Sequence, residues 1–210
     1  MSIKINWHKD QKIWVSSDYH FSHWNINTHC NRGFSSVEEM DGAIIANHNS
    51  VVSDNDYFIH LGDLYWGHSV DTMTHFLSAM NGSKILLLGN HDYLIQKMTH
   101  DQKIAAKIDY IGNYIMLKTQ IMTGNNQLKK VKFAMMHFPI LQWDHKHYGT
   151  LHTHGHSHGS LFKNDHRMRE WYYSQKVMDV GLDTNGLLPY NLQDIYEKLK
   201  DNDVKTIDHH

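Results

Sequence analysis

The chain is organised around Leu86-Leu87-Leu88-Gly89-Asn90-His91-Asp92. A short apolar run that ends in a glycine indicates a buried strand followed by a turn, where the backbone can approach a ligand closely. The polar tip carries the functional signal: Asn90 offers an amide oxygen to a metal ion, and His91 offers an imidazole that exchanges a proton near neutral pH. An isolated Gly-Asn-His would be an ordinary turn. Four further clusters of the same ligand types, at the ends of other predicted strands, favour the functional interpretation.

Composition sets the broad class of the protein. We expect residues 1–210 to form a single domain, because no linker, repeat or low-complexity tract interrupts them. With 20 basic and 22 acidic side chains the formal charge is −2, so a surface built mainly to bind long nucleic acid or a membrane is not expected, whereas a local basic pocket is left open. Cys30 is the only cysteine, which excludes an internal disulfide and a cysteine-based zinc site. The chain shows neither a secretory segment nor a bilayer-spanning run, so a cytoplasmic location is expected.

Histidine is over-represented, with 20 residues in the chain. It is the commonest metal ligand among side chains, so histidines placed after strands indicate a metal site. The sequence also leaves open a less organised alternative, in which a His-rich segment binds metal adventitiously.

Strands and helices alternate in the first half of the chain. Apolar patterns predict strands at 13–16, 57–61 and 84–88, with helices at 35–51 and 69–80 between them. This order predicts crossover units of parallel strands with a site at their carboxyl ends.

The first two of these strands end in carboxylates. Asp18 and His20 follow the first, and Asp63 follows the second directly after Gly62. Because residues two apart in an extended segment point the same way, Asp18 and His20 are expected to reach one ion together.

The second half of the chain has a different pattern. Residues 114–122 and 128–136 predict a β-hairpin that ends at His137. In 150–159 the histidines recur at every second position, and we favour His156 and His158 as ligands over His152 and His154, because glycines flank that pair.

The C-terminal part of the chain is expected to support the site. Strands are predicted at 167–172 and 176–180, and a last helix at 192–200 is expected on the surface. Asp179 and Asp183 are interpreted as groups that support the ligands.

These clusters resemble a known family. In order, Asp18-x-His20, Gly62-Asp63, Gly89-Asn90-His91-Asp92, His137 and Gly155-His156-x-His158 are similar to the five motifs of the calcineurin-like metallophosphoesterase superfamily. Segments 18–26 and 37–41 are similar to a compact bacterial and bacteriophage branch of it. The resemblance spans residues 13–158 and implies a four-layer α/β/β/α sandwich with two mixed β-sheets, in place of the simple parallel sheet that the local pattern gives.

The resemblance also implies a ligand set for two divalent ions. One ion would be held by Asp18, His20, Asp63 and His158, and the other by Asp63, Asn90, His137 and His156, with Asp63 as the bridge. Two ions roughly 3.5–4 Å apart clamp phosphoryl oxygens and lower the pKa of a bound water to about 7. A metal-bridging hydroxide would then attack phosphorus in line, and His91 would donate a proton to the leaving oxygen. These ligands suit Mn²⁺, Fe²⁺, Zn²⁺ or Ni²⁺, and we expect Mn²⁺ to give the best activity.

The chain departs from the protein Ser/Thr phosphatases of this superfamily. It lacks the Asp-Arg pair after Gly62-Asp63, and it has Asp92 where those enzymes have Glu. Protein phosphatase activity is therefore not expected, and the residue that orients His91 is not identified by the sequence. The nearest candidates for contacts with the substrate's phosphate or base are His23, Arg32 and the loop 143–147.

Three functions follow from these observations. The leading one is a phosphodiesterase acting on a nucleotide or another small phosphodiester. A phosphomonoesterase or a nuclease on the same metal core is the alternative, and a clustered positive groove would favour the nuclease. A non-catalytic scaffold would be expected to have lost ligands, and none is lost here. The sequence does not indicate the oligomeric state.

Overall fold

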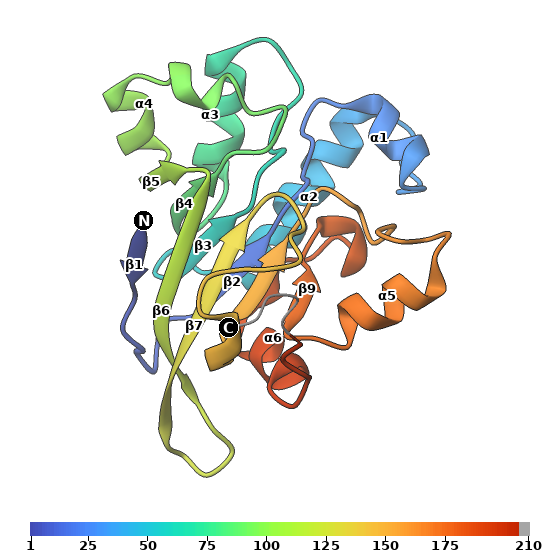
Figure 1. The fold of residues 1–210 in the computed structure, drawn as a ribbon. Coiled ribbons are helices and arrows are strands. Elements are labelled where there is room, and N and C mark those ends of the chain that lie inside the picture. Colours follow the sequence, from blue (N-terminus) through green and yellow to red (C-terminus); the bar gives the residue numbers. More distant parts are fainter. Residues whose placement is uncertain (206–210) are drawn as a thin grey trace.

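Two five-stranded β-sheets form the centre of the protein (Figure 1), in a computed structural model that describes residues 1–205. The first sheet has the strand order β10 (Tyr190–Asn191), β2 (Ile13–Ser16), β3 (Tyr57–His60), β4 (Ser83–Leu87) and β5 (Ile108–Gly112). The second has the order β1 (Ser2–Lys4), β6 (Tyr114–Met122), β7 (Leu128–Met136), β8 (Leu151–His154) and β9 (Val177–Asp179). Both sheets are mixed, because β10 runs antiparallel to β2 and β6 antiparallel to β7, whereas the other neighbours are parallel.

Alternate residues of the strands separate the core into two parts. The inward side chains of β2, β3 and β4 pack against β6 and β7 between the sheets: Val15, Ile59, Ile85 and Leu87. The outward side chains of the same strands pack against helices: Trp14, Phe58 and Leu86. Because each strand is buried on both faces, the three strands are apolar almost throughout.

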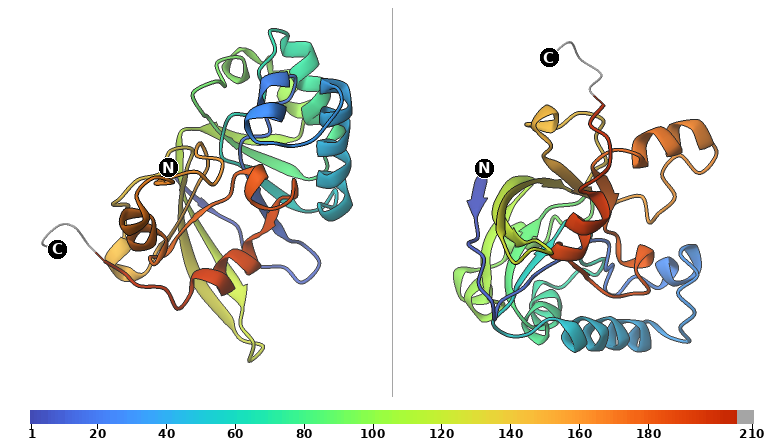
Figure 2. Two further views of the ribbon diagram at one scale, coloured as in Figure 1. Left: turned by 90° about the vertical axis from the view of Figure 1, so that its right-hand side faces the viewer. Right: turned by 90° about the horizontal axis from the view of Figure 1, so that it is seen from below.

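Helices cover both outer faces of the pair of sheets. The first sheet is covered by α1 (Trp24–His29), α2 (Val37–Val51), α3 (Val70–Ala79) and α4 (His100–Ala105). The second is covered in part by α5 (His166–Tyr173), and Figure 2 shows α2 and α5 on opposite sides of the sheets. Short 3₁₀ helices occupy Ile95–Lys97, Lys146–Tyr148 and Leu182–Thr184. The expected four-layer arrangement with two mixed sheets is confirmed.

The last helix, α6 (Leu192–Leu199), is more deeply buried than the sequence predicts. Its Leu192, Ile195 and Leu199 enter the core between the sheets, so α6 closes one edge of the sandwich. Asn191 caps it as expected, because its side chain accepts a hydrogen bond from the backbone N–H of Gln193.

One predicted element has a different type of secondary structure in the protein. The strand predicted at 167–172 is instead the helix α5, which Asp165 caps by accepting from the N–H of Met168. A short aromatic stretch fits both the helical and the strand period, and the N-cap hydrogen bond of Asp165 favours the helix. The strand at 13–16 and the hairpin arms at 114–122 and 128–136 are confirmed to the residue. Among the described residues, no helix combines the length and the apolar character needed to cross a membrane.

Candidate metal centre

The loops that follow five strands meet at one edge of the two sheets. They carry all seven predicted ligands together with His91: Asp18 and His20 after β2, Asp63 after β3, Asn90 and His91 after β4, His137 after β7, and His156 and His158 after β8. Backbone hydrogen bonds join these loops, for example from the N–H of Asp18 to the carbonyl of Gly62 at 2.9 Å.

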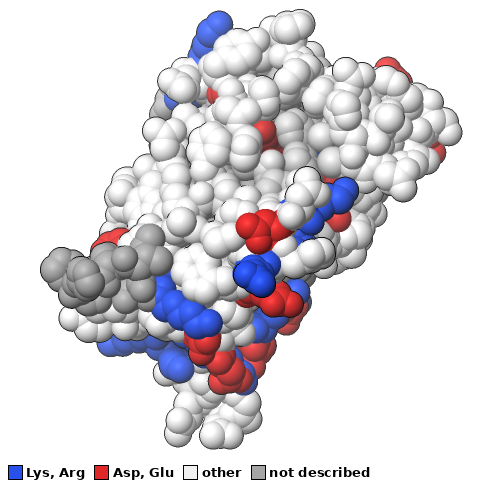
Figure 3. Space-filling view, turned by 45° about the vertical axis from the view of Figure 1, so that its right-hand side comes forward, with Lys and Arg blue, Asp and Glu red and all other residues white. Residues whose placement is uncertain are grey.

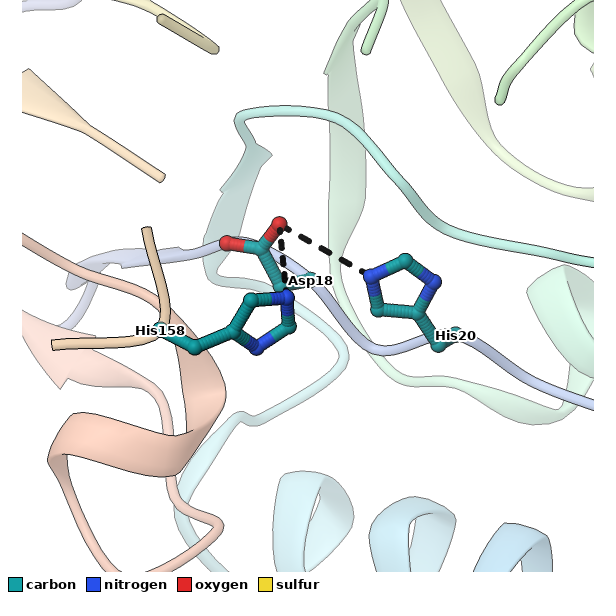
Figure 4. A group of neighbouring side chains, drawn as sticks. All are labelled: Asp18, His20 and His158. Atoms are coloured by element: carbon teal, nitrogen blue, oxygen red, sulfur yellow. Dashed lines mark ion pairs between the residues drawn. The ribbon is translucent and has the colours of Figure 1, made fainter. Parts of the chain in front are cut away.

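The first group of ligand atoms comes from Asp18, His20 and His158. In Figure 4 the Asp18 carboxylate faces both imidazole rings, and its Oδ1 lies 3.9 Å from Nε2 of each. The Oδ2 of Asp63 lies 3.7 Å from the same His20 nitrogen.

The second group comes from Asp63, His137 and His156. The Nε2 of His137 lies 3.5 Å from Asp63 Oδ2, 3.2 Å from His156 Nδ1 and 3.0 Å from the amide oxygen of Asn90. The same oxygen of Asp63 therefore faces both groups.

The protonation of His137 shows that this second group fits a cation. Burial lowers the pKa of His137 to about 4, so its ring is neutral near pH 7. Its Nδ1 donates to the carbonyl of Leu61 at 2.9 Å, which leaves a bare lone pair on Nε2. Three acceptors therefore face one another: this lone pair, the Asn90 oxygen and the Asp63 carboxylate. A metal ion bound between them would remove their mutual repulsion.

The environment of His20 shows that the first group also fits a cation. The residue is 4% exposed, and neither ring nitrogen has a hydrogen-bond partner in the described part of the chain. Burial lowers the pKa of His20 to about 2, so the ring is neutral. A buried imidazole without partners is unfavourable, and coordination of a cation removes that cost. The residues present therefore fit divalent metal ions in both groups.

Five of the seven predicted ligands have left-handed backbone conformations. Their φ angles are 62° at Asp18, 53° at His20, 56° at Asp63, 68° at His156 and 46° at His158. The expectation that Asp18 and His20 share one side of an extended segment was therefore wrong, although both still reach one point. Non-glycine residues rarely adopt this region, and such conformations gather at functional sites.

Two glycines make room for ligand carboxylates. A Cβ atom at Gly89 would overlap the Oδ1 of Asp63, and one at Gly155 would overlap the Oγ of Ser17 and approach the carboxylate of Asp18. The role expected for Gly89, a close approach of the backbone to the site, is confirmed.

Arg32 supports the site from within and does not face a substrate. Its Nε and one Nη donate to the carboxylate of Asp183 at 2.7 and 2.9 Å, and the remaining donors meet the carbonyls of Asp18 and Tyr19 and the sulfur of Met40. The side chain is 1% exposed. All five N–H donors are thus used inside the protein, which corrects the expectation that Arg32 contacts the substrate.

Three acids hold the loops in place. Asp183 accepts a 2.7 Å hydrogen bond from Nδ1 of His158, which leaves Nε2 of that ring for a metal ion. The buried Asp92 accepts from the backbone N–H groups of Asp63, Leu64 and Gly89. Asp179 accepts from Ser157, Gly159 and Gly181.

His23 and His91 both contact a residue that sequence reasoning missed. The ring of His23 stacks on Trp66 with centroids 4.0 Å apart and planes 8° apart, and His91 contacts the same indole at 4.2 Å. The backbone N–H of His91 donates to Asp63 Oδ1 at 3.0 Å. Trp66 follows Gly62-Asp63 and is 40% exposed; an aromatic residue so close to a ligand motif was the available signal.

The two histidines within β8 lie outside both groups of candidate metal ligands. His152 and His154 are fully buried, and their Nδ1 atoms donate to the carbonyls of Ala134 and Gly155. Neither contributes an atom to the two clusters described above.

The family model of the calcineurin-like phosphoesterases matches residues 11–210. The chain belongs to this family. Its candidate metal ligands lie together at one edge of the two sheets.

The chain is also similar to proteins whose descriptions name no activity or substrate. An uncharacterised protein of Methanocaldococcus jannaschii is 39% identical over 108 residues, which make up 51% of this chain and 57% of that protein. The Gene 66 protein of Mycobacterium phage L5 is 28% identical over 196 residues, covering 83% of this chain and 88% of the phage protein. A solved structure of a protein of unknown function from Aquifex aeolicus shares the fold, with a TM-score of 0.59 and 20% identity over 90% of this chain and 99% of that one.

Proposed function

We propose that the protein is a phosphodiesterase with two divalent metal ions, and that its substrate is a nucleotide or another small phosphodiester. The observation that carries the proposal is the shared carboxylate: Asp63 Oδ2 lies 3.7 Å from His20 Nε2 in one group and 3.5 Å from His137 Nε2 in the other. One carboxylate between two sets of bare imidazole nitrogens supports a bridging role. We propose Mn²⁺ as the preferred metal, which the mixed oxygen and nitrogen ligands support.

Bound divalent ions would supply Lewis acidity towards phosphoryl oxygens and a water that ionises near neutral pH. Asp18, His20, Asp63 and His158 would hold one ion, and Asp63, Asn90, His137 and His156 the other. His91 would protonate the leaving oxygen. Its side chain is 37% exposed at the rim of the site, while its backbone is anchored to Asp63.

The proposed preference for a diester follows from charge. A phosphate monoester carries about −1.5 to −2 charges near pH 7, whereas a diester carries one, so a monoester gains more from an arginine clamp. Arg32, the arginine of the loop after the first ligands, is used entirely within the protein. A cytoplasmic location is part of the proposal, and the single cysteine supports it.

The test compares hydrolysis of bis(p-nitrophenyl) phosphate and p-nitrophenyl phosphate by chelator-stripped protein with Mn²⁺ added back. Metal-dependent turnover that is faster on the diester is expected. Faster turnover of the monoester would favour the phosphomonoesterase. Metal binding without turnover of either compound would contradict the proposal.

Two variants separate metal binding from proton donation. Asp63→Asn should lose both bound metal and activity, whereas His91→Ala should keep its metal content and lose turnover. His75→Ala, at an exposed position in α3, is the matched control and should behave like the wild type. Full activity with two bound ions in Asp63→Asn would rule out the bridging role.

A further inference from the structure

Three lysines lie side by side in one row across the second sheet. Lys4 of β1 is directly opposite Lys118 of β6, and Lys118 is directly opposite Lys132 of β7. Directly opposite residues have Cβ atoms about 4.5–5.5 Å apart, so the row is a ladder of like charges.

The row lies on an uncovered part of the sheet's outer face. Leu117 and Thr119 flank Lys118 in β6 and are buried, so Lys118 points away from the core. Nearer the metal centre the same face is covered, because Met116 and Ala134 pack against the loop and helix that carry Trp143 and Tyr172. Lys4, Lys118 and Lys130 are exposed, and Lys132 is half-buried.

These four lysines, which we call the lysine face, have no counter-charge from the residues that the structure describes. Within residues 1–205, Lys4, Lys118, Lys130 and Lys132 make neither an ion pair nor a side-chain hydrogen bond. They line a hollow of about 290 Å³ together with Asn6, Thr119, Gln120 and Val131, and no acidic residue of the described part of the chain lines it.

A second basic hollow adjoins the first. Its volume is about 270 Å³, and it shares Lys130 and Lys132 with the lysine face. Three further lysines and an exposed tyrosine line it: Lys129, Lys176, Lys200 and Tyr148. Lys200 pairs with Glu197, but among residues 1–205 no carboxylate lines this hollow either. On the face shown in Figure 3, acidic and basic side chains intermingle in the lower part of the molecule.

Protection of sheet edges does not explain the whole row. Lysines on edge strands prevent pairing with other chains, which accounts for Lys4 in the edge strand β1. Lys118 is in β6, which is paired on both sides, by β1 and by β7. Because like charges directly opposite one another are destabilising, the row opposes folding and is better explained by a ligand.

We propose that the lysine face binds the phosphate backbone of a nucleic-acid strand. A line of closely spaced cations complements a line of closely spaced phosphates, and the exposed ring of Tyr148 offers a stacking surface beside it. From Lys132 the strand β7 leads to His137, five residues or roughly 16 Å away at about 3.3 Å per residue. A bound strand could therefore extend to the metal centre.

The net charge of −2 argued against long nucleic acid, but it is an average over the whole chain. The average conceals the gathering of lysines on one surface, which arises only when distant strands pair. The inference does not rest on the proposed phosphodiesterase activity, because binding at the lysine face needs no metal ion.

The experiment measures fluorescence anisotropy of a short fluorescein-labelled oligothymidylate with chelator-treated wild-type protein and with Lys118→Gln/Lys132→Gln. We expect binding at about 50 mM salt that weakens as salt rises, and at least about tenfold weaker binding by the variant. The slope of log affinity against log salt should fall by about 1.4, that is, about 0.7 for each of two lost contacts.

Controls separate this result from misfolding and from bulk charge. Lys103→Gln/Lys163→Gln removes the same charge outside both hollows and should bind like the wild type. The thermal midpoint of Lys118→Gln/Lys132→Gln should equal or exceed that of the wild type, because repulsion within the row is relieved.

Three outcomes would overturn the inference. The first is the absence of binding by the wild type at low salt. The second is an unchanged affinity and salt slope in Lys118→Gln/Lys132→Gln. The third is displacement of the oligonucleotide by polyglutamate or anionic vesicles as effectively as by unlabelled oligonucleotide, which would assign the surface to another anion. Because chelator is present throughout, none of these results depends on turnover at the metal centre.

Discussion

The indole ring of Trp66 lies against the imidazole of His91, with ring centroids 4.2 Å apart and planes inclined by 56°. Within the described residues, the ring nitrogens of His91 make no hydrogen bond, and the nearest carboxyl oxygen, Asp63 Oδ2, is 3.9 Å from Nε2. We therefore propose that packing against Trp66 orients the ring of His91. Trp66 is itself fixed by its stack on His23.

Trp66→Ala should impair proton donation by His91. General acid catalysis contributes about 10²–10⁴-fold, and it matters most when the leaving alcohol is strongly basic. We expect Trp66→Ala to lower kcat about tenfold or more for alkyl leaving groups and only slightly for p-nitrophenolate. In the His91→Ala background, Trp66→Ala should not lower kcat any further, because the two residues act as one unit. Steady-state kinetics over a series of leaving groups gives both readouts.

Trp24→Ala provides the matched control, since Trp24 is 43% exposed. It should leave kcat and the leaving-group dependence unchanged. An equal loss on all substrates in Trp66→Ala, or additive losses in the double variant, would show that Trp66 does not position His91.

Asp183→Asn should weaken both metal binding and the fold. The substitution removes the carboxylate that accepts from His158 Nδ1 and leaves the buried Arg32 without its counter-charge. We expect about a 10–100-fold loss of Mn²⁺ affinity by calorimetry, and about 3–5 kcal/mol less stability in urea unfolding. Asp54→Asn, at an exposed surface pair with Lys107, should leave the stability nearly unchanged. Equal costs in both variants would contradict the role of Asp183.

Gly89→Ala should disrupt the centre through a steric overlap with Asp63 Oδ1. Displacement of that carboxylate predicts loss of bound Mn²⁺, measured by metal analysis, and at least about 100-fold lower activity. Gly42→Ala is the control, because the position is in α2 and a Cβ there meets no atom within 4 Å. It should raise the unfolding free energy by about 0.5–1 kcal/mol. Normal metal content in Gly89→Ala would show that the loop tolerates the methyl group.

His48 should make the stability of the chelator-treated protein depend on pH. Burial lowers the pKa of His48 to about 4, against about 6.5 in an unfolded chain. Between these values the unfolded state binds a proton that the folded state does not, so stability falls as pH falls, by up to about 1.4 kcal/mol per pH unit. Above about pH 6.5 both states are neutral and the residue has no effect on the slope.

The measurement is the unfolding free energy at several pH values for the wild type and for His48→Gln. The variant should show a shallower decline between about pH 6.5 and 4, because one titrating group is gone. The exposed His75→Gln should follow the wild type. Parallel curves for the wild type and His48→Gln would refute the assignment.

Much of the fold was predictable because the signals are local. The apolar runs of β2, β3 and β4 and the arms of the hairpin appear in windows of a few residues, and the order of five motifs identified the family. The helix α5 was mistaken for a strand because eight residues rich in aromatic side chains fit either period. The burial of α6 could not be predicted, because it depends on the gap between two sheets.

The sequence by itself determined which ligand types are present and in which order they follow the strands. The tertiary structure alone decided which atoms meet: Asp63 between two groups of imidazoles, Asp183 between His158 and Arg32, Trp66 against His91, and Lys118 between Lys4 and Lys132. The physical reason is that such contacts join residues far apart in the chain. Strand register and packing bring them together, and the backbone rotates five ligands into left-handed conformations that no local pattern indicates.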